Sequence, residues 1–150
     1  LLYLAFVFAG GFFIEVVGVN TGLIFGHYNY GEGLSIKLFD TPLMIGLNWA
    51  LMVYLSAAVV RSFRRNFLFQ VLLPSTIMVA YDVIMEQVAP KMDMWNWAGE
   101  TIPLQNYLLW ATIAVVFHAV RYFIRLEVNN RMALPILIIQ SIFFLLIWLI

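Results

Sequence analysis

Cysteine is absent from the 150 residues of this chain, which excludes a disulfide framework and a thiolate metal site. Histidine occurs at only two positions, His27 and His118, too few for a histidine-rich metal cluster. Charged residues make up 11% of the sequence, against about a quarter of an average soluble domain. Because acidic and basic residues balance to a net charge of zero, no basic surface for nucleic acid is expected.

Hydrophobic residues make up 64% of the chain, which indicates an integral membrane protein. Five apolar segments come near the roughly 20 helical residues that cross a hydrocarbon core of about 30 Å: 1–19, 42–60, 67–88, 106–124 and 133–150. Backbone groups in lipid must pair internally, and the alternation of barrel strands is missing. We therefore predict an all-α, polytopic helix bundle in one membrane domain, residues 1–150, with a bend near Pro74. Both chain ends lie inside apolar runs, as in a fragment that lacks flanking helices.

The basic residues are distributed unevenly among the four connections. Six arginines lie in or beside the two short turns, at positions 61, 64, 65, 121, 125 and 131, whereas the two long connections hold only Lys37 and Lys91. The positive-inside rule therefore predicts that turns 61–66 and 125–132 are cytoplasmic and that the long connections lie on the opposite side. We interpret the arginines as topology determinants and lipid-headgroup contacts.

The two long connections, 20–41 and 89–105, are rich in aromatic residues and do not resemble ordinary solvated loops. One interpretation is an aromatic belt at the level of the lipid headgroups. The other is that both loops fold back over the helices and roof a cavity, because loops of about 20 residues are more often functional than idle. The sequence leaves both interpretations open.

Three acidic residues, Glu15, Asp82 and Glu86, lie in otherwise apolar sequence. A charged group at the bilayer centre costs about 2.5–3.5 kcal/mol, so these acids are expected to face protein or a wet cavity. Asp82 and Glu86 are four residues apart and share a helix face. Two carboxylates this close do not ionise together easily, so one is expected to keep a proton, as a general acid must. Alternatively, the acids pair with Lys91 or with loop backbone.

The predicted topology brings Glu15, Asp82 and Glu86 to the same leaflet as Asn106 and the two long loops. Several sequence blocks are familiar there. Residues 15–30 read EVVGVNTGLIFGHYNY, and Pro42-Leu43 is followed by Trp49. Further blocks are Asp82 with EQVAP at 86–90, WNW at 95–97, and IPLQNY at 102–107 with Trp110. Over residues 9–110 the chain resembles a membrane family of carotenoid biosynthesis proteins. That family includes bacterial γ-carotene 1′,2′-hydratases and archaeal bisanhydrobacterioruberin hydratases.

This resemblance implies acid-catalysed addition of water to a terminal alkene of an acyclic carotenoid, without a metal or organic cofactor. Asp82 is then the first candidate for proton donor and Glu15 the second, while Glu86 or Asp93 tunes the proton or orients the water. The implied substrate-binding residues hold the water or product hydroxyl, or contact the polyene: His27, Tyr28, Tyr30, Trp49, Trp95, Trp97 and Asn106. The implied location is a bacterial or archaeal cytoplasmic membrane, with the carotenoid and membrane lipid as partners.

Three other functions remain open at this point. A carotene cyclase shares the protonation step but closes a ring where a hydratase adds water. A non-catalytic protein would bind a carotenoid or act as an auxiliary subunit of a larger membrane assembly. A proton-translocating bundle would need ionisable groups through the whole membrane depth. Because this chain gathers its acids on one side, we rank that function last.

Overall fold

The computed structural model describes residues 1–99 and 101–150, and within them the chain is a bundle of five α-helices. They are α1 (Leu2–Thr21), α2 (Leu43–Val59), α3 (Leu73–Val88), α4 (Leu104–Phe123) and α5 (Ala133–Leu149). A 3₁₀ turn, η1 (Val60–Ser62), extends α2, and a π-helical turn, η2 (Leu68–Leu72), precedes α3. The predicted helix bundle is confirmed. The helix ends shift by at most two residues, except that α3 itself begins at Leu73 and the π-helical turn η2 fills most of the earlier part of the predicted span 67–88.

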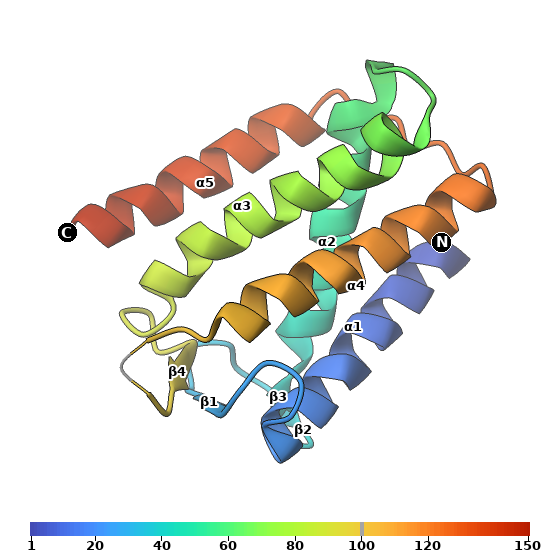
Figure 1. Ribbon diagram of the computed structural model, residues 1–150. Helices are drawn as coiled ribbons and strands as arrows, with labels where there is room; N and C mark the ends of the chain where they lie inside the picture. The colour runs from blue at the N-terminus through green and yellow to red at the C-terminus, as the bar shows by residue number, and fades with distance from the viewer. Residues whose placement is uncertain (100) are drawn as a thin grey trace.

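Helix α2 is the central element of the bundle. It packs against each of the other four α-helices and crosses behind the layer that α5, α3, α4 and α1 form in Figure 1. Its buried side chains, which include Trp49, Met52 and Val53, belong to the main hydrophobic cluster. Three helical segments are long and apolar enough to cross a membrane: Leu2–Thr21, Leu43–Ser62 and Leu68–Val88. These properties agree with the predicted membrane protein.

The irregular start of the third helical segment follows from its proline. Pro74 has no N–H, so it cannot donate to the carbonyl of Gln70, four residues earlier. That carbonyl accepts a hydrogen bond from Nη2 of Arg121 on α4, and the π-helical turn η2 ends at Leu72, two residues before Pro74. The irregularity expected near Pro74 is therefore a π turn, a common form of helix irregularity.

The all-α prediction missed four short strands in the two long connections. Strand β1 (Tyr28–Tyr30) pairs antiparallel with β4 (Trp95–Trp97), and β2 (Lys37–Leu38) pairs with β3 (Thr41–Pro42). In the first pair Tyr28 lies opposite Trp97, and Tyr30 opposite Trp95. The two connections thus fold together at one end of the bundle, below α4 and beside the lower end of α1 in Figure 1. This is the second of the two interpretations that the sequence left open.

Helix ends position this loop pair over the bundle. Helix α1 stops at Gly22, whose φ of 67° is left-handed and whose N–H bonds to the carbonyl of Gly18. Gln105, in the first turn of α4, donates to the carbonyls of Leu23 and Ile24 at 2.6 Å. The segment that leads into β1 is therefore attached to both α1 and α4.

Candidate functional site

The three acids of the apolar segments meet in one small cavity beneath the β1–β4 pair. Its volume is about 30 Å³, which is about the space of one water molecule. Its walls come from four helices and both strands of the pair: Glu15, Phe25, Tyr28, Tyr30, Ile45, Asn48, Tyr81, Asp82, Met85, Glu86, Trp95, Trp97, Asn106 and Trp110. We call it the acid cavity.

Glu15 accepts three hydrogen bonds from aromatic side chains. The hydroxyls of Tyr28 and Tyr30 donate to Oε2 at 2.7 and 2.9 Å, and Nε1 of Trp49 donates to Oε1 at 3.1 Å. Burial raises the pKa of both tyrosines and the nearby Glu15 carboxylate raises it further, so both phenols remain donors. Glu15 is only 4% exposed, and these donors replace the water that it loses.

Glu86 also accepts three hydrogen bonds, here from N–H groups. The indoles of Trp95 and Trp97 donate to Oε2 at 3.1 and 2.8 Å, and Nδ2 of Asn106 donates to Oε1 at 2.9 Å. The alternative that Glu86 pairs with Lys91 is wrong, because the Lys91 ammonium donates to the carbonyls of Ile147 and Trp148. The ion pairs among the described residues, Lys37–Glu32 and Arg65–Glu127, do not involve the acid cavity.

Asp82 differs from both glutamates. It is 2% exposed, yet its carboxyl makes one side-chain hydrogen bond among the described residues, a long contact of 3.5 Å with Nδ2 of Asn106. Good N–H···O hydrogen bonds are about 2.9–3.0 Å long, so this contact is weak. Asn106 therefore bridges Asp82 and Glu86 but binds Glu86 more closely. The cavity therefore holds two carboxyl groups that each accept three hydrogen bonds and one that accepts a single weak one.

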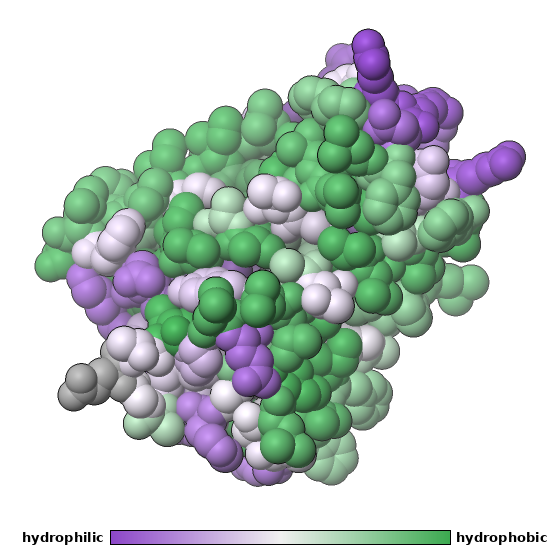
Figure 2. Space-filling view, in the orientation of Figure 1, coloured by the Kyte–Doolittle hydropathy of each residue, from purple (hydrophilic) through white to green (hydrophobic). Residues whose placement is uncertain are grey.

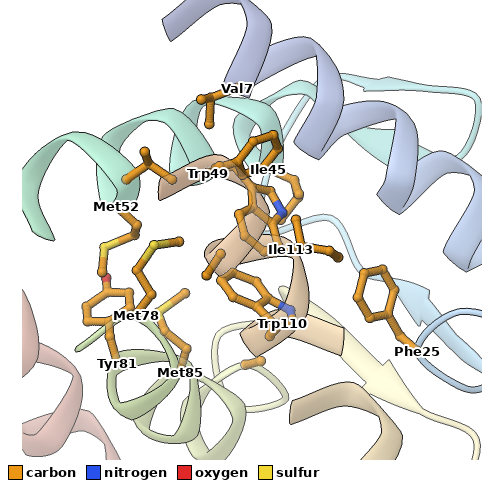
Figure 3. Packing of buried hydrophobic residues seen from close by; sticks show 14 of the residues in the cluster. Val7, Phe25, Ile45, Trp49, Met52, Met78, Tyr81, Met85, Trp110 and Ile113 are labelled. Carbon is orange, nitrogen blue, oxygen red and sulfur yellow. The ribbon is translucent and has the colours of Figure 1, made fainter. Parts of the chain in front are cut away.

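The aromatic residues around the acids form two groups. Trp49 and Trp110 stack at 3.9 Å between ring centroids, in the packed centre drawn in Figure 3. The ring centroids of Tyr28 and Trp97 are 5.1 Å apart and those of Tyr30 and Trp95 are 6.3 Å apart, in agreement with the strand register. Trp49 is fully buried behind Glu15 and is not part of the cavity wall, whereas Trp110 is.

A family model described as carotenoid biosynthesis protein matches the chain over residues 1–150. The chain belongs to this family. No curated protein and no solved structure matches it. Membership in the carotenoid biosynthesis family agrees with the resemblance found in the sequence and indicates a carotenoid-related role for the protein.

Eight of the residues predicted for the site of this carotenoid biosynthesis protein line the acid cavity: Glu15, Tyr28, Tyr30, Asp82, Glu86, Trp95, Trp97 and Asn106. His27 and Asp93 lie outside it. His27, the residue before β1, is exposed, whereas Tyr28 and Tyr30 of β1 face inward. Asp93 is exposed and accepts a hydrogen bond from the Glu32 N–H at 2.9 Å, so it organises the loop.

Two polar wall residues of this carotenoid biosynthesis protein were not predicted, Asn48 on α2 and Tyr81 on α3. Both stand beside residues already singled out, Trp49 and Asp82. Asn48 could have been predicted, because it is a polar residue inside an apolar span and such a group is expected to face the bundle interior. Tyr81 had no distinguishing pattern of its own.

Proposed function

We propose that this protein is a carotenoid hydratase-like enzyme that adds water to a terminal C=C bond of an acyclic carotenoid end group by acid catalysis. One observation carries the proposal: three buried carboxyl groups with unequal hydrogen bonding share a cavity of about the size of a water molecule. Family membership supports a carotenoid as the substrate.

In this proposal Asp82 is the proton donor. A carboxylate is an acceptor only, so three donors favour the ionised form of the carboxyl group that they meet. Glu15 and Glu86 fit that description. Asp82 has one weak contact and keeps capacity for a proton. Glu15, the second candidate from the sequence, becomes a fixed negative charge.

The reaction balances with water as the only co-reactant. The π electrons of the alkene take the proton of Asp82 and form a new C–H bond, which leaves a tertiary carbocation. Water attacks the cation, forms the C–O bond and loses a proton to the Asp82 carboxylate. The product is a tertiary alcohol and the acid is restored. The carboxylates of Glu15 and Glu86 and the surrounding aromatic faces stabilise the cation.

The cavity volume supports a role in holding the water. About 30 Å³ fits one water and is far too small for an isoprenoid end group. Asn48 and Asn106 supply amide groups that bind a water or the product hydroxyl. The alkene then approaches from the lipid, where a long polyene dissolves, and side chains of the wall move aside to admit its end.

The test is expression in a host that accumulates lycopene or γ-carotene, with mass analysis of the extracted pigments. The protein should add the mass of one water to the carotenoid. Asp82→Asn should lower the hydrated product by about 10²–10⁴-fold, which is the range that general acids contribute. Asp40→Asn makes the same chemical change at an exposed loop position outside the cavity and should leave the yield unaltered.

Glu15→Gln and Glu86→Gln complete the series. Each places an amide N–H₂ where several donors already point, so both protein yield and activity should fall. Hydrated product that persists undiminished in Asp82→Asn, at equal protein level, would remove Asp82 as the acid.

The aromatic wall also supports a second candidate function, a carotene cyclase. Aromatic rings stabilise the carbocation equally well whether water or ring closure consumes it. Cyclisation changes no mass, so the same pigment analysis separates the two reactions. A carotenoid-binding subunit of a larger assembly would return the pigment unmodified and copurify with visible absorption.

A further inference from the structure

A second and larger cavity lies at the end of the bundle that carries the arginine-rich turns. Its volume is about 500 Å³, within the range of pockets that hold small molecules. Four arginines line it: Arg61 from η1, Arg65 from the turn that follows, Arg121 from α4 and Arg125 from the next turn. We call it the arginine pocket.

The charge of the arginine pocket is mostly uncompensated. Among the described residues, Glu127 is the one acid in its wall, and it pairs with Arg65 at 2.7 Å. The side chains of Arg61 and Arg125 have no hydrogen-bond or ion-pair partner among the described residues. Arg121 donates to carbonyls through its Nη atoms, to Leu126 and to Gln70. Three positive charges therefore remain for a ligand.

The most specific feature of the pocket is Arg121. Its side chain is buried, with 4% exposure, yet its Nε–H has no hydrogen-bond partner in the part of the chain that the structure describes. A buried unpaired donor costs free energy that a ligand can recover. Both Nη atoms of Arg121 already donate to carbonyls, so its Nε–H is the donor that remains for an anion oxygen.

We propose that the arginine pocket binds a phosphate group. Its position at the ends of α2 and α4 is where the headgroups of a bilayer would lie. The apolar wall residues Phe123 and Leu126 are 72% and 38% exposed and suit the start of an acyl chain. A lipid phosphate and a free phosphate share this chemistry, so the experiment distinguishes them.

The experiment measures lipid binding to the purified full chain in an uncharged detergent, by native mass spectrometry with added phosphatidylglycerol or phosphatidylcholine. Arg121 is left intact because it also holds the Gln70 carbonyl. The pocket variant is Arg61→Gln with Arg125→Gln. The control variant is Arg64→Gln with Arg131→Gln, which removes two exposed arginines from the same turns but outside the pocket.

The wild type should bind phosphatidylglycerol at least about 10-fold more tightly than phosphatidylcholine. The pocket variant should lose at least about 10-fold in affinity, because each charge-assisted hydrogen bond is worth roughly that factor. The control variant should stay within about 2-fold. Competition by millimolar inorganic phosphate supports a free phosphate as the ligand, and its failure supports a lipid headgroup. Equal losses in both variants, or equal binding of both lipids, would overturn the proposal, and neither outcome depends on hydratase activity.

Discussion

Trp49 is the residue that connects the packed core to the acid cavity. It is fully buried, stacks on Trp110 and donates to Glu15. Its place is available only because residue 11 of α1 has no side chain. A Cβ built at Gly11 would lie 2.5 Å from Cγ of Trp49, closer than real Cβ atoms come to a neighbour. The small residue on α1 therefore determines where the indole, and with it Glu15, can lie.

We expect Gly11→Ala to destabilise the protein and to lower its activity. Overpacking of a core costs about 1–3 kcal/mol, and the helix propensity gained from alanine returns at most about 1 kcal/mol. The displaced indole would withdraw its hydrogen bond from Glu15. Thermal unfolding in detergent and pigment analysis in cells measure the two effects.

The neighbouring glycine provides a matched control for this prediction. A Cβ at Gly10 would come within 3.2 Å of the edge of the Phe117 ring, and that ring needs to shift by only a few tenths of an ångström. Gly10→Ala should therefore match the wild type in activity and lie close to it in stability. Equal behaviour of the two variants would contradict the role given to Gly11.

At the residue scale, the sequence predicted which acids are functional candidates but not how their hydrogen bonding differs. Glu15, Asp82 and Glu86 were identified because a charged side chain in an apolar segment costs free energy, and such residues in membrane spans mark functional sites. Which of them lacks donors depends on side chains that reach it from four separate elements. The distances between side chains of different elements cannot be inferred from residue spacing along the chain. His27 and Asp93 were misplaced for the same reason, since loop side chains have no periodicity that assigns them an inner or outer face.

At the scale of elements, the β1–β4 pair supplies most of the donors that hold the glutamates. Tyr28 and Tyr30 serve Glu15, while Trp95 and Trp97 serve Glu86. Opening the pair would leave two buried carboxylates with too few hydrogen bonds, at about 1–3 kcal/mol for each lost partner. The strand pair should therefore stay closed while the substrate enters between helices.

A disulfide across the strand pair tests this expectation. Asn29 and Asn96 are directly opposed and both face outward. Opposed residues of antiparallel strands lie about 4.5–5.5 Å apart at Cα, within the range of disulfides. In this cysteine-free chain the double variant Asn29→Cys with Asn96→Cys has no competing thiol. We expect the oxidised form to keep its activity and to gain roughly 2–4 kcal/mol of stability.

The measurement compares hydration and thermal unfolding of that variant with and without reductant, in purified protein supplied with carotenoid. Each single cysteine variant serves as a control for the substitutions. Activity that disappears on oxidation and returns on reduction would mean that the strand pair opens during turnover.

The helices were predictable from the sequence at this scale and the strand pair was not. Five apolar segments of bilayer length define the helices because lipid leaves the backbone few alternatives. Strand pairing between two loops from distant parts of the chain depends on the bundle first bringing those loops together. Aromatic residues at alternate positions, in YNY at 28–30 and WNW at 95–97, were the local signal, but their partner could not be inferred.

At the scale of the whole molecule, the surface is polar at the two ends of the helix bundle and apolar between them. Figure 2 shows the hydrophobic surface across the middle, with hydrophilic residues gathered near the arginine-rich turns at upper right and near the strands at lower left. The acid cavity and the arginine pocket lie at opposite ends of the helices. Exposed apolar residues on α5, such as Ile139 and Phe143, suit contact with lipid tails.

This asymmetry leads to a prediction of orientation. The lysines at the strand end are engaged, Lys37 with Glu32 and Lys91 with carbonyls of α5, whereas the arginines concentrate at the other end. Positive-inside bias then makes the arginine end cytoplasmic and the acid cavity external. Single cysteines at exposed positions of this cysteine-free chain report the side directly. In intact cells a membrane-impermeant maleimide should label Asn29→Cys, and it should label Ser62→Cys only after the membrane is permeabilised. The opposite labelling pattern would invert the orientation and place the arginine pocket in the outer leaflet.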